Sequence, residues 1–464
     1  MRRGPLVGSA RRSGSRRAVV GAAFAACALA CVGCDVIIGL QTPVPDEDAR
    51  SPAAAAIPPE AASLASDDAR AGERDATAGQ AISDAGVTEA APGIAACGDG
   101  SMACSNACAD ILSSSENCGA CGHNCLGAPC SGGRCLPTVL SAGTPSHIAV
   151  DGTNVYWTDA TLLSVMACPA SGCQDAGPKT LYAWSSSVLP PAGPPAYGRT
   201  GAIAVQGSQV FFTIPAPGAA YFEDDDVLSC PTDGGASFVI GGGYSQGAVV
   251  ANAQSVYWMT PENGTETWGV NECPLSGCGT GTPIDVAFGA ADPNEPWAIA
   301  AGPGGVYYAD IADGVGGCSS SGCACSTDDP GSCEIANSNL EAAAIAVGSA
   351  SVFWASLNQV FVSTPDGSGS SPNAGVLVQS SPSSTIEALA VDDENVYFTT
   401  DDDGGSIYSC AVNGCGDVGT LVASNLTGVG DIKVDAHRIY AVVGTEVGAS
   451  VPPGGGLGVV WIAK

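Results

Sequence analysis

The strongest constraint on this chain is a segment that occurs seven times after residue 147. Each copy has an apolar run, a four-residue turn rich in Gly, Asp, Asn or Ser, and a second apolar run that contains aromatic side chains. The copies begin at Ile148, Ile203, Val249, Ile299, Ile345, Leu389 and Ile432. The Val or Ile that opens the second run recurs at positions 155, 210, 256, 306, 352, 396 and 439, and the copies align without a gap. This period indicates a repeat architecture.

Each copy is followed by a second pair of short apolar runs, most clearly at residues 163–168 and 180–184. Four short antiparallel strands in every ~40 to 50 residues are typical of a β-propeller blade. The strands are apolar on both faces, as expected for a sheet that lies between two other sheets. We therefore predict an all-β fold, a seven-bladed β-propeller over residues 136–464.

The two ends of the repeat region predict how the ring closes. The last copy has only three strands, and a spare strand at residues 137–141 precedes the first copy. That spare strand resembles the fourth strands of other copies, at residues 376–378 and 420–423. We expect the N-terminal strand to complete the last blade.

The charge of the chain restricts its partners. The sequence has 46 Asp and Glu residues against 15 Lys and Arg residues, a formal net charge of −31. Phosphate binding needs clustered basic side chains, so a nucleic-acid partner is excluded. Residues 136–464 contain only five basic residues, namely Lys179, Arg199, Lys433, Arg438 and Lys464. The charge favours basic partners or divalent cations.

The first 33 residues have the form of an export signal, with six arginines before an uncharged stretch at residues 18–32. That stretch is too short for a comfortable membrane span. The sequence Val32-Gly33-Cys34 resembles a bacterial lipobox, although Cys31 stands where Leu is usual and Cys27 and Cys31 are rival acceptors. The resemblance implies that Cys34 is lipidated, and the run at residues 34–40 (CDVIIGL) resembles the start of lipoproteins of Gram-negative bacteria.

The alternative is a simple secretory peptide that is cut nearby. Residues 15–20 (SRRAVV) also resemble a twin-arginine export motif, so the export route stays open. Residues 34–96 are rich in Ala, Pro, Ser, Asp and Glu and lack aromatic side chains, which predicts a disordered tether. We expect an exported protein of the cell envelope, periplasmic or surface-facing, that contacts the membrane only through its N-terminal lipid.

Residues 97–135 predict a separate small module. They contain eight cysteines in a segment too short for a hydrophobic core, and disulfides can substitute for one. The sequence does not choose among the possible pairings. The alternative is zinc, because Cys118, Cys121 and Cys125 have ligand-like spacing. The run from Asn117 to Cys125 resembles small Cys-rich modules of exported bacterial proteins, which supply no activity.

Further cysteines lie inside the blades. Four pairs share the spacing Cys-x4-Cys at the end of a third strand, where a disulfide can pin the turn. These pairs are Cys168 and Cys173, Cys273 and Cys278, Cys318 and Cys323, and Cys410 and Cys415. We also expect a bridge between Cys325 and Cys333, and Cys230 is the candidate free thiol.

Signals for chemistry are weak. The chain has three histidines, of which His147 opens the first blade and His437 lies in an inner turn of the last, where we expect solvent exposure. Oxygen-rich loops provide calcium candidates at Asp224, Asp226, Asp401 and Asp403, but neither loop matches an EF-hand. We identify no catalytic residue and no other cofactor. We expect the tryptophans at 157, 258 and 354 to be buried and those at 268 and 297 to suit an exposed surface.

The preferred interpretation is a non-enzymatic module that binds a protein, peptide or glycan through long loops such as residues 189–195 and 262–268. The alternative is a propeller enzyme, a lyase or hydrolase, that acts at the central channel. A purely structural envelope component is a third possibility. Propellers serve all these roles, so the fold does not choose among them. A convergent cluster of His, acid and Arg at the channel mouth favours an enzyme, whereas Asp, Ser and aromatic side chains alone favour binding. The oligomeric state and the membrane leaflet stay open.

Overall fold

The structure is a computed structural model. It describes residues 97–464 except residues 106, 160–161, 174–176, 185–200, 216–224, 242–247, 262–266, 280, 291–297, 311–313, 320–333, 337–341, 366–374, 380–383, 417, 427 and 445–457. All the described residues belong to one compact unit. The predicted signal, lipidation site and tether therefore lie outside the described residues.

Seven four-stranded antiparallel sheets form the propeller, one for each copy of the repeat. Blade 1 contains β6 (Pro145–Val150), β7 (Asn154–Asp159), β8 (Ser164–Pro169) and β9 (Lys179–Ala183). Blade 2 contains β10 (Ile203–Gln206), β11 (Gln209–Pro215), β12 (Asp225–Pro231) and β13 (Phe238–Gly241). Blade 3 contains β14 (Val249–Ala251), β15 (Ser255–Pro261), β16 (Thr267–Pro274) and β17 (Ile284–Ala290). Blade 4 contains β18 (Ala298–Gly302), β19 (Gly305–Asp310), β20 (Gly314–Ser319) and β21 (Glu334–Ala336).

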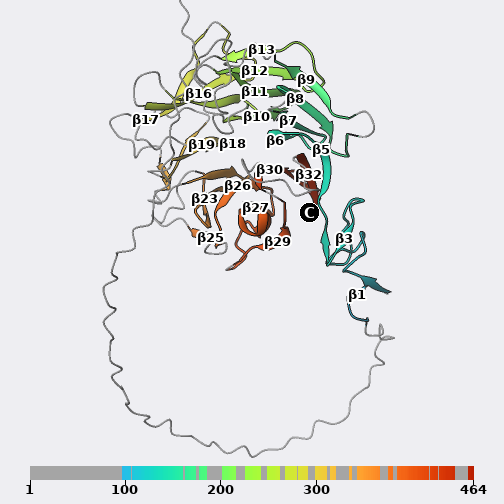
Figure 1. Cartoon of the computed structure of the whole chain (residues 1–464). Helices are drawn as coiled ribbons and strands as arrows, with labels where there is room; N and C mark the ends of the chain where they lie inside the picture. The colour runs from blue at the N-terminus through green and yellow to red at the C-terminus, as the bar shows by residue number, and fades with distance from the viewer. Residues whose placement is uncertain are drawn as a thin grey trace, which may run out of the picture. The chain divides into compact units, whose positions relative to one another are not determined.

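The remaining blades follow the same order. Blade 5 contains β22 (Ala344–Val347), β23 (Val352–Ser356), β24 (Gln359–Ser363) and β25 (Gly375–Gln379). Blade 6 contains β26 (Ile386–Val391), β27 (Asn395–Thr400), the 3-10 helix η3 (Asp402–Gly404), β28 (Ser406–Ala411) and β29 (Thr420–Ala423). Blade 7 contains β30 (Val429–Val434), β31 (Arg438–Val443), β32 (Gly458–Ala463) and β5 (Thr138–Ala142). The first strands, among them β6, β10, β18, β26 and β30, lie towards the middle of the ring (Figure 1).

The predicted all-β, seven-bladed fold is thus confirmed. Strand β5 pairs with β32 as the fourth strand of blade 7, with Ala142 opposite Gly458. All seven blades have a β-bulge at the same place between their third and fourth strands, for example between Val165 and Met166 in blade 1. The pairing of β5 has this bulge between Val459 and Val460, so the N-terminal strand follows the register of the other six.

The core of the propeller lies between neighbouring blades. Tyr156 and Val165 of blade 1 pack with Phe212 of blade 2, and Phe211 of blade 2 packs with Trp258 of blade 3. Each blade is therefore buried on both faces, which explains why its second strand is apolar throughout. Trp157, Trp258 and Trp354 occupy equivalent positions and are among the largest fully buried side chains.

The Cys-rich segment forms two small hairpins, β1 (Ser101–Cys104) with β2 (Ala107–Asp110), and β3 (Cys130–Ser131) with β4 (Arg134–Cys135). Its eight cysteines pair as Cys97–Cys108, Cys104–Cys121, Cys118–Cys130 and Cys125–Cys135. Cys118 and Cys125 are buried in the same apolar cluster as Ile439 and Ile462 of blade 7. The module therefore packs against the propeller.

Candidate functional site

The first strands of the blades surround a central cavity of about 510 Å³. Its walls consist mainly of Ala, Val and Ile side chains from the repeated Ile-Ala-Val run. Four charged or titratable side chains interrupt this apolar lining: His147, Glu387, Asp431 and Lys433. They come from blades 1, 6 and 7, so one side of the channel contains all the charge of the lining.

Irregular pairing places these side chains in the channel. Strand β6 shifts register between Pro145 and Ile148, and β26 shifts between Ile386 and Leu389. His147 and Glu387 lie within these irregular stretches. Irregular pairing of this kind redirects side chains and is common beside functional sites.

Asp431 is the centre of the charged cluster. One carboxylate oxygen lies 2.6 Å from the Nζ of Lys433. The other accepts a 3.1 Å hydrogen bond from the backbone N–H of Ile148 and lies 3.8 Å from the Nδ1 of His147. Burial alone would raise the pKa of Asp431, but the charge of Lys433 and the contact with His147 outweigh it and hold the pKa at about 2. At neutral pH this carboxylate is ionised, and it joins blade 7 to blade 1.

The cluster differs from the arrangement that would favour an enzyme. It contains a histidine and two acids, but its basic side chain is Lys433 instead of an arginine, and Lys433 already neutralises Asp431. A general acid or base works best with a pKa near the operating pH, and Asp431 is far from that range. His147, about a third of whose side chain is exposed, and Glu387 are the remaining candidate bases.

The turn between the first and second strands has a recurring polar pair. In blade 1, Asp151 accepts hydrogen bonds from the N–H groups of Thr153 and Asn154, and its second oxygen accepts one of 2.7 Å from the hydroxyl of Tyr156. The same pair joins Asp392 to Tyr397 in blade 6 at 3.2 Å. In blade 7 it joins Asp435 to Tyr440 at 2.8 Å. In blade 3 Asn252 replaces the acid and donates to Tyr257 at 3.3 Å.

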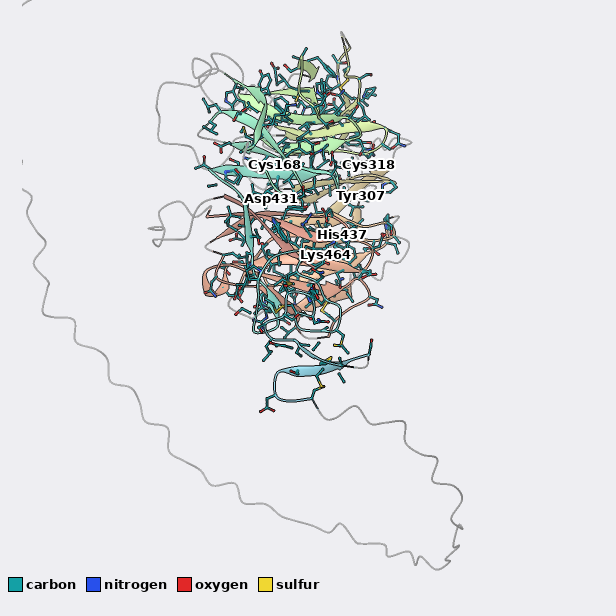
Figure 2. The ribbon with its side chains drawn as sticks, turned by 90° about the vertical axis from the view of Figure 1, so that its right-hand side faces the viewer. Cys168, Tyr307, Cys318, Asp431, His437 and Lys464 are labelled. Atoms are coloured by element: carbon teal, nitrogen blue, oxygen red, sulfur yellow. A yellow bond between two sulfur atoms is a disulfide. The ribbon has the colours of Figure 1, made fainter. Side chains whose placement is uncertain are left out.

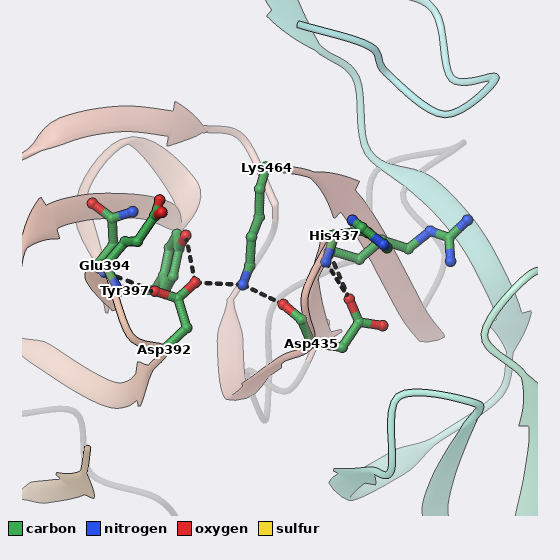
Figure 3. Close-up of polar contacts among 8 residues, drawn as sticks. Asp392, Glu394, Tyr397, Asp435, His437 and Lys464 are labelled. Carbon is green, nitrogen blue, oxygen red and sulfur yellow. Dashed lines mark hydrogen bonds and ion pairs between the residues drawn. The ribbon is translucent and has the colours of Figure 1, made fainter. Parts of the chain in front are cut away.

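Lys464 connects two of these turns (Figure 3). Its Nζ lies 2.5 Å from the Oδ2 of Asp392, donates to the backbone carbonyl of Asp435, and lies 5.2 Å from the centre of the Tyr397 ring. Its backbone N–H donates to the carbonyl of His437 at 3.0 Å. Burial would raise the pKa of Asp392, but Lys464 and two backbone N–H groups lower it below its ordinary value. This network fastens blade 6 to blade 7.

The same residue also contacts the Cys-rich module. The Nε2 of His123 lies 2.7 Å from the backbone oxygen of Lys464, and its Nδ1 contacts the carbonyl of Cys118. Figure 2 shows Lys464 and His437 close together and Asp431 apart from them, so the channel cluster and this network are separate. The sequence did not reveal the network, because its members come from four segments. The Asp–Tyr pairs had a visible signal, an Asp five residues before a Tyr in three copies.

Two of the four calcium candidates, Asp226 and Asp401, have described side chains. Asp401 accepts hydrogen bonds from the N–H and hydroxyl of Thr385 at 2.9 and 3.1 Å. Asp226 lies in β12, Asp224 is outside the described residues, and so is the side chain of Asp403. Within the described residues, the one group of three possible metal ligands is Cys118, Cys125 and Cys135, whose sulfurs are in disulfides. Calcium binding stays a prediction.

The blade cysteines form short bridges where they are described. Disulfides join Cys168 to Cys173, Cys273 to Cys278 and Cys410 to Cys415. Cys318 is also disulfide-bonded, whereas Cys323, Cys325 and Cys333 lie outside the described residues. Cys230 is a buried free thiol whose pKa burial raises to about 11, so it is not reactive at neutral pH. Disulfides in this number are typical of proteins outside the cytoplasm.

The structure also places the two histidines of the propeller. His147 lies in the channel beside Asp431, whereas His437 is exposed in the turn before β31. The side chain of Trp268, Trp297 and the loop at 189–195 are outside the described residues, as are residues 262–266. No helix among the described residues is long and apolar enough to cross a membrane.

Comparisons with known proteins add the following. Neither a protein-family model nor a curated protein matches the chain. Among solved structures, the chain is similar to BamB from Moraxella catarrhalis (12% identity, 69% of this chain and 83% of that one, TM-score 0.38). It is also similar to PorZ, a surface component of the type-IX secretion system of Porphyromonas gingivalis (11%, 67% and 37%, 0.42). A third is the WD40 propeller domain of Doa1 (9%, 71% and 97%, 0.45). Similarity at this level says nothing about function, and the fold assignment rests on the strand pairing above.

Proposed function

We propose that this chain is an exported lipoprotein whose propeller is a non-enzymatic binding module for a protein, peptide or glycan. In this proposal residues 1–33 are the signal peptide, Cys34 carries the lipid, and residues 34–96 are the tether. The Cys-rich module covers residues 97–135 and the propeller residues 136–464. The ring is then displayed at a distance from the membrane, in the periplasm or at the cell surface.

One observation carries the binding part of the proposal: the lining of the central channel. Its walls are small apolar side chains, and its one charged cluster contains an acid that Lys433 and the N–H of Ile148 already engage. Such a channel supplies a shaped apolar surface with a few fixed polar groups, as ligand-binding cavities do. The strongly acidic composition supports a partner with positive charge.

The second candidate is a channel enzyme, and the contact between His147 and Asp431 favours it. An acid that orients a histidine is a common part of acid–base sites. In this reading His147 is the base, and Asp431 orients it without changing its own protonation.

Recovering the bound ligand distinguishes a binding module from an enzyme. The mature protein is exposed to peptide and glycan arrays, and each retained ligand is eluted and weighed by mass spectrometry. Ligands recovered intact from the wild type support the binding module. Ligands that return cleaved or with an eliminated group, with turnover lost in His147→Ala, support the enzyme.

Anchoring needs its own test. The intact mass of the protein from envelope membranes should show a start at Cys34 with attached acyl chains. Cys34→Ala should release the protein into the soluble fraction, whereas Cys31→Ala should not. An unlipidated mature protein in the membrane-free fraction of wild-type cells contradicts the anchor and leaves the binding proposal intact.

A further inference from the structure

A second cavity, of about 680 Å³, lies between the Cys-rich module and blades 6 and 7. We call it the module crevice. His123 and Arg134 line its module side, and Asp393 and Glu394, from the turn after β26, line its propeller side. The volume falls within the range of sites for small ligands. Nothing in the channel contributes to it, since the two cavities share no lining residue.

Between these charged sides the crevice has an apolar part. Leu421 and Val422 of β29 are its partly exposed apolar side chains, and the buried Ile439 and Ile462 of blade 7 lie behind them. An apolar floor between charged rims suits a ligand whose polar groups are separated by apolar ones. Sites of this composition orient a ligand through its ends and gain affinity from the apolar part.

The walls of the crevice are held in place before any ligand arrives. Lys464 ties the turn of blade 6 to that of blade 7, and His123 ties the module to Lys464. The disulfides Cys118–Cys130 and Cys125–Cys135 brace the module side. A preformed site avoids the cost of ordering its walls on binding.

The rims carry opposite charges that the described residues leave without partners. Asp393 and Glu394 are exposed, and their side chains make no hydrogen bond or ion pair with the described part of the chain. The same holds for the guanidinium of Arg134 on the opposite rim. Asp392 differs, because Lys464 already neutralises it. The free charges therefore belong to the two rims and not to the floor.

We propose that the module crevice binds a short peptide end that carries a basic side chain, apolar residues and a free carboxylate. The basic side chain pairs with Asp393 and Glu394, the apolar residues cover Leu421 and Val422, and the carboxylate pairs with Arg134. A guanidinium binds carboxylates with two parallel hydrogen bonds, which suits a chain end. This inference rests on the proposed binding function and adds a peptide site, separate from the channel, on the turn side of blades 6 and 7.

The test uses the full mature chain and three probes: acetyl-Lys-Val-Leu with a free carboxylate, its C-terminal amide, and acetyl-Ala-Val-Leu with a free carboxylate. Calorimetric titration should give the highest affinity for the first. The double variant Asp393→Asn, Glu394→Gln should weaken that probe about tenfold and leave the Ala probe unchanged, since exposed ion pairs are each worth up to ~1 kcal/mol. Arg134→Gln should weaken the free acid about threefold and leave the amide unchanged.

The matched control is Asp233→Asn, which removes an exposed carboxylate from a turn of blade 2. It should change no affinity, which separates rim contacts from the general charge of the protein. No binding of any probe by the wild type, or equal weakening by Asp233→Asn, overturns the inference. An array peptide that binds the wild type and the rim variants equally also overturns it, but leaves the proposed binding function standing. If no array ligand binds the wild type, both this inference and the proposed binding function are contradicted.

Discussion

Blades 1, 6 and 7 and blades 2 and 5 build the same inner hairpin with different chemistry. In the first group an Asp at the start of the turn accepts two backbone N–H groups and a Tyr hydroxyl, as Asp151 and Tyr156 do. In the second group Gln206 and Gly348 replace the Asp, and Phe211 and Phe353 replace the Tyr. The turn still forms, since Gly348 donates its N–H to the carbonyl of Ser351 at 2.8 Å. The acid is therefore not needed to make the turn.

The two positions change together because a buried hydroxyl without a partner is destabilising. The neighbouring blade follows the same rule. Lys464 contacts the Tyr397 pair of blade 6, whereas Val412 packs against the apolar cluster that contains Phe353, and Leu275 against the one that contains Phe211. The seams between blades thus exist in a polar and an apolar version. Blade 4 departs from this rule, because it keeps the Tyr, as Tyr307, but has Gly302 at the position of the Asp.

The largest effect should come from breaking the polar seam at its most connected point. Asp392→Ala leaves the Lys464 ammonium, the Tyr397 hydroxyl and two N–H groups without their acceptor. We expect a loss of about 3 kcal/mol in the free energy of unfolding, measured by chemical denaturation. Asp151→Ala, which has no lysine partner, should cost about 1–2 kcal/mol. Equal losses in the two variants would show that Lys464 contributes nothing.

Introducing the Tyr without the Asp into an apolar blade should have the next largest effect on stability. Phe211→Tyr places a hydroxyl in a fully buried position without an acid, at a cost of about 2 kcal/mol. Adding Gln206→Asp should restore most of this loss, as the thermal midpoint will show. Gln206→Asp alone is the control. A double variant no more stable than Phe211→Tyr would mean that the pair cannot be transferred between blades.

Removing only the hydroxyl tests the pair itself. Tyr156→Phe should lower the free energy of unfolding by about 1 kcal/mol, because Asp151 loses one of its donors. In an Asp151→Ala background the same substitution should cost much less, which a double-mutant cycle measures. Additive effects would contradict an interaction between the two side chains.

The smallest effect should come from lowering the pH, which protonates the Asp of the first group of blades and leaves the turns of the second group unchanged. Burial would raise the pKa of Asp151, but the N–H groups of Asn154 and Thr153 and the Tyr156 hydroxyl lower it below its ordinary value. The contribution of this carboxylate is complete above the unfolded pKa of about 3.9 and is lost as the pH falls through the folded pKa. Hydrogen exchange should show the amides of residues 153 and 154 losing protection below this pH. The equivalent amides of blades 2 and 5 should not change, and a uniform loss would refute the distinction.

Much of the fold was predictable because seven copies of the repeat have the same local sequence pattern. The runs at 163–168 and 180–184 are β8 and β9 to within one residue, and the spare run at 137–141 is β5. Short apolar runs and turn composition are local signals, and each copy supports the others. The common bulge between third and fourth strands was not predictable, since it appears only in the pairing register.

The site was less predictable for the same reason. Asp431, Lys433 and His147 meet because blades 7 and 1 are neighbours, and only Lys433 and Asp431 are close in sequence. The module crevice combines Arg134 with Glu394, two segments that no pattern connects. Contacts of this kind depend on where the ring closes and where the module packs.

The pairing of β5 with β32 has a consequence for how the protein is made. Among the described strands of the propeller, β5 is synthesised first and its partner β32 last, so Ala142 cannot pair until Gly458 has been made. Until then blade 7 lacks β32, and β5 has no partner strand in it. A pairing between such distant parts of a chain makes folding slow and exposes the intermediates to aggregation. Any translocation that threads the chain unfolded delivers β5 first, and the ring stays open until the whole propeller has crossed.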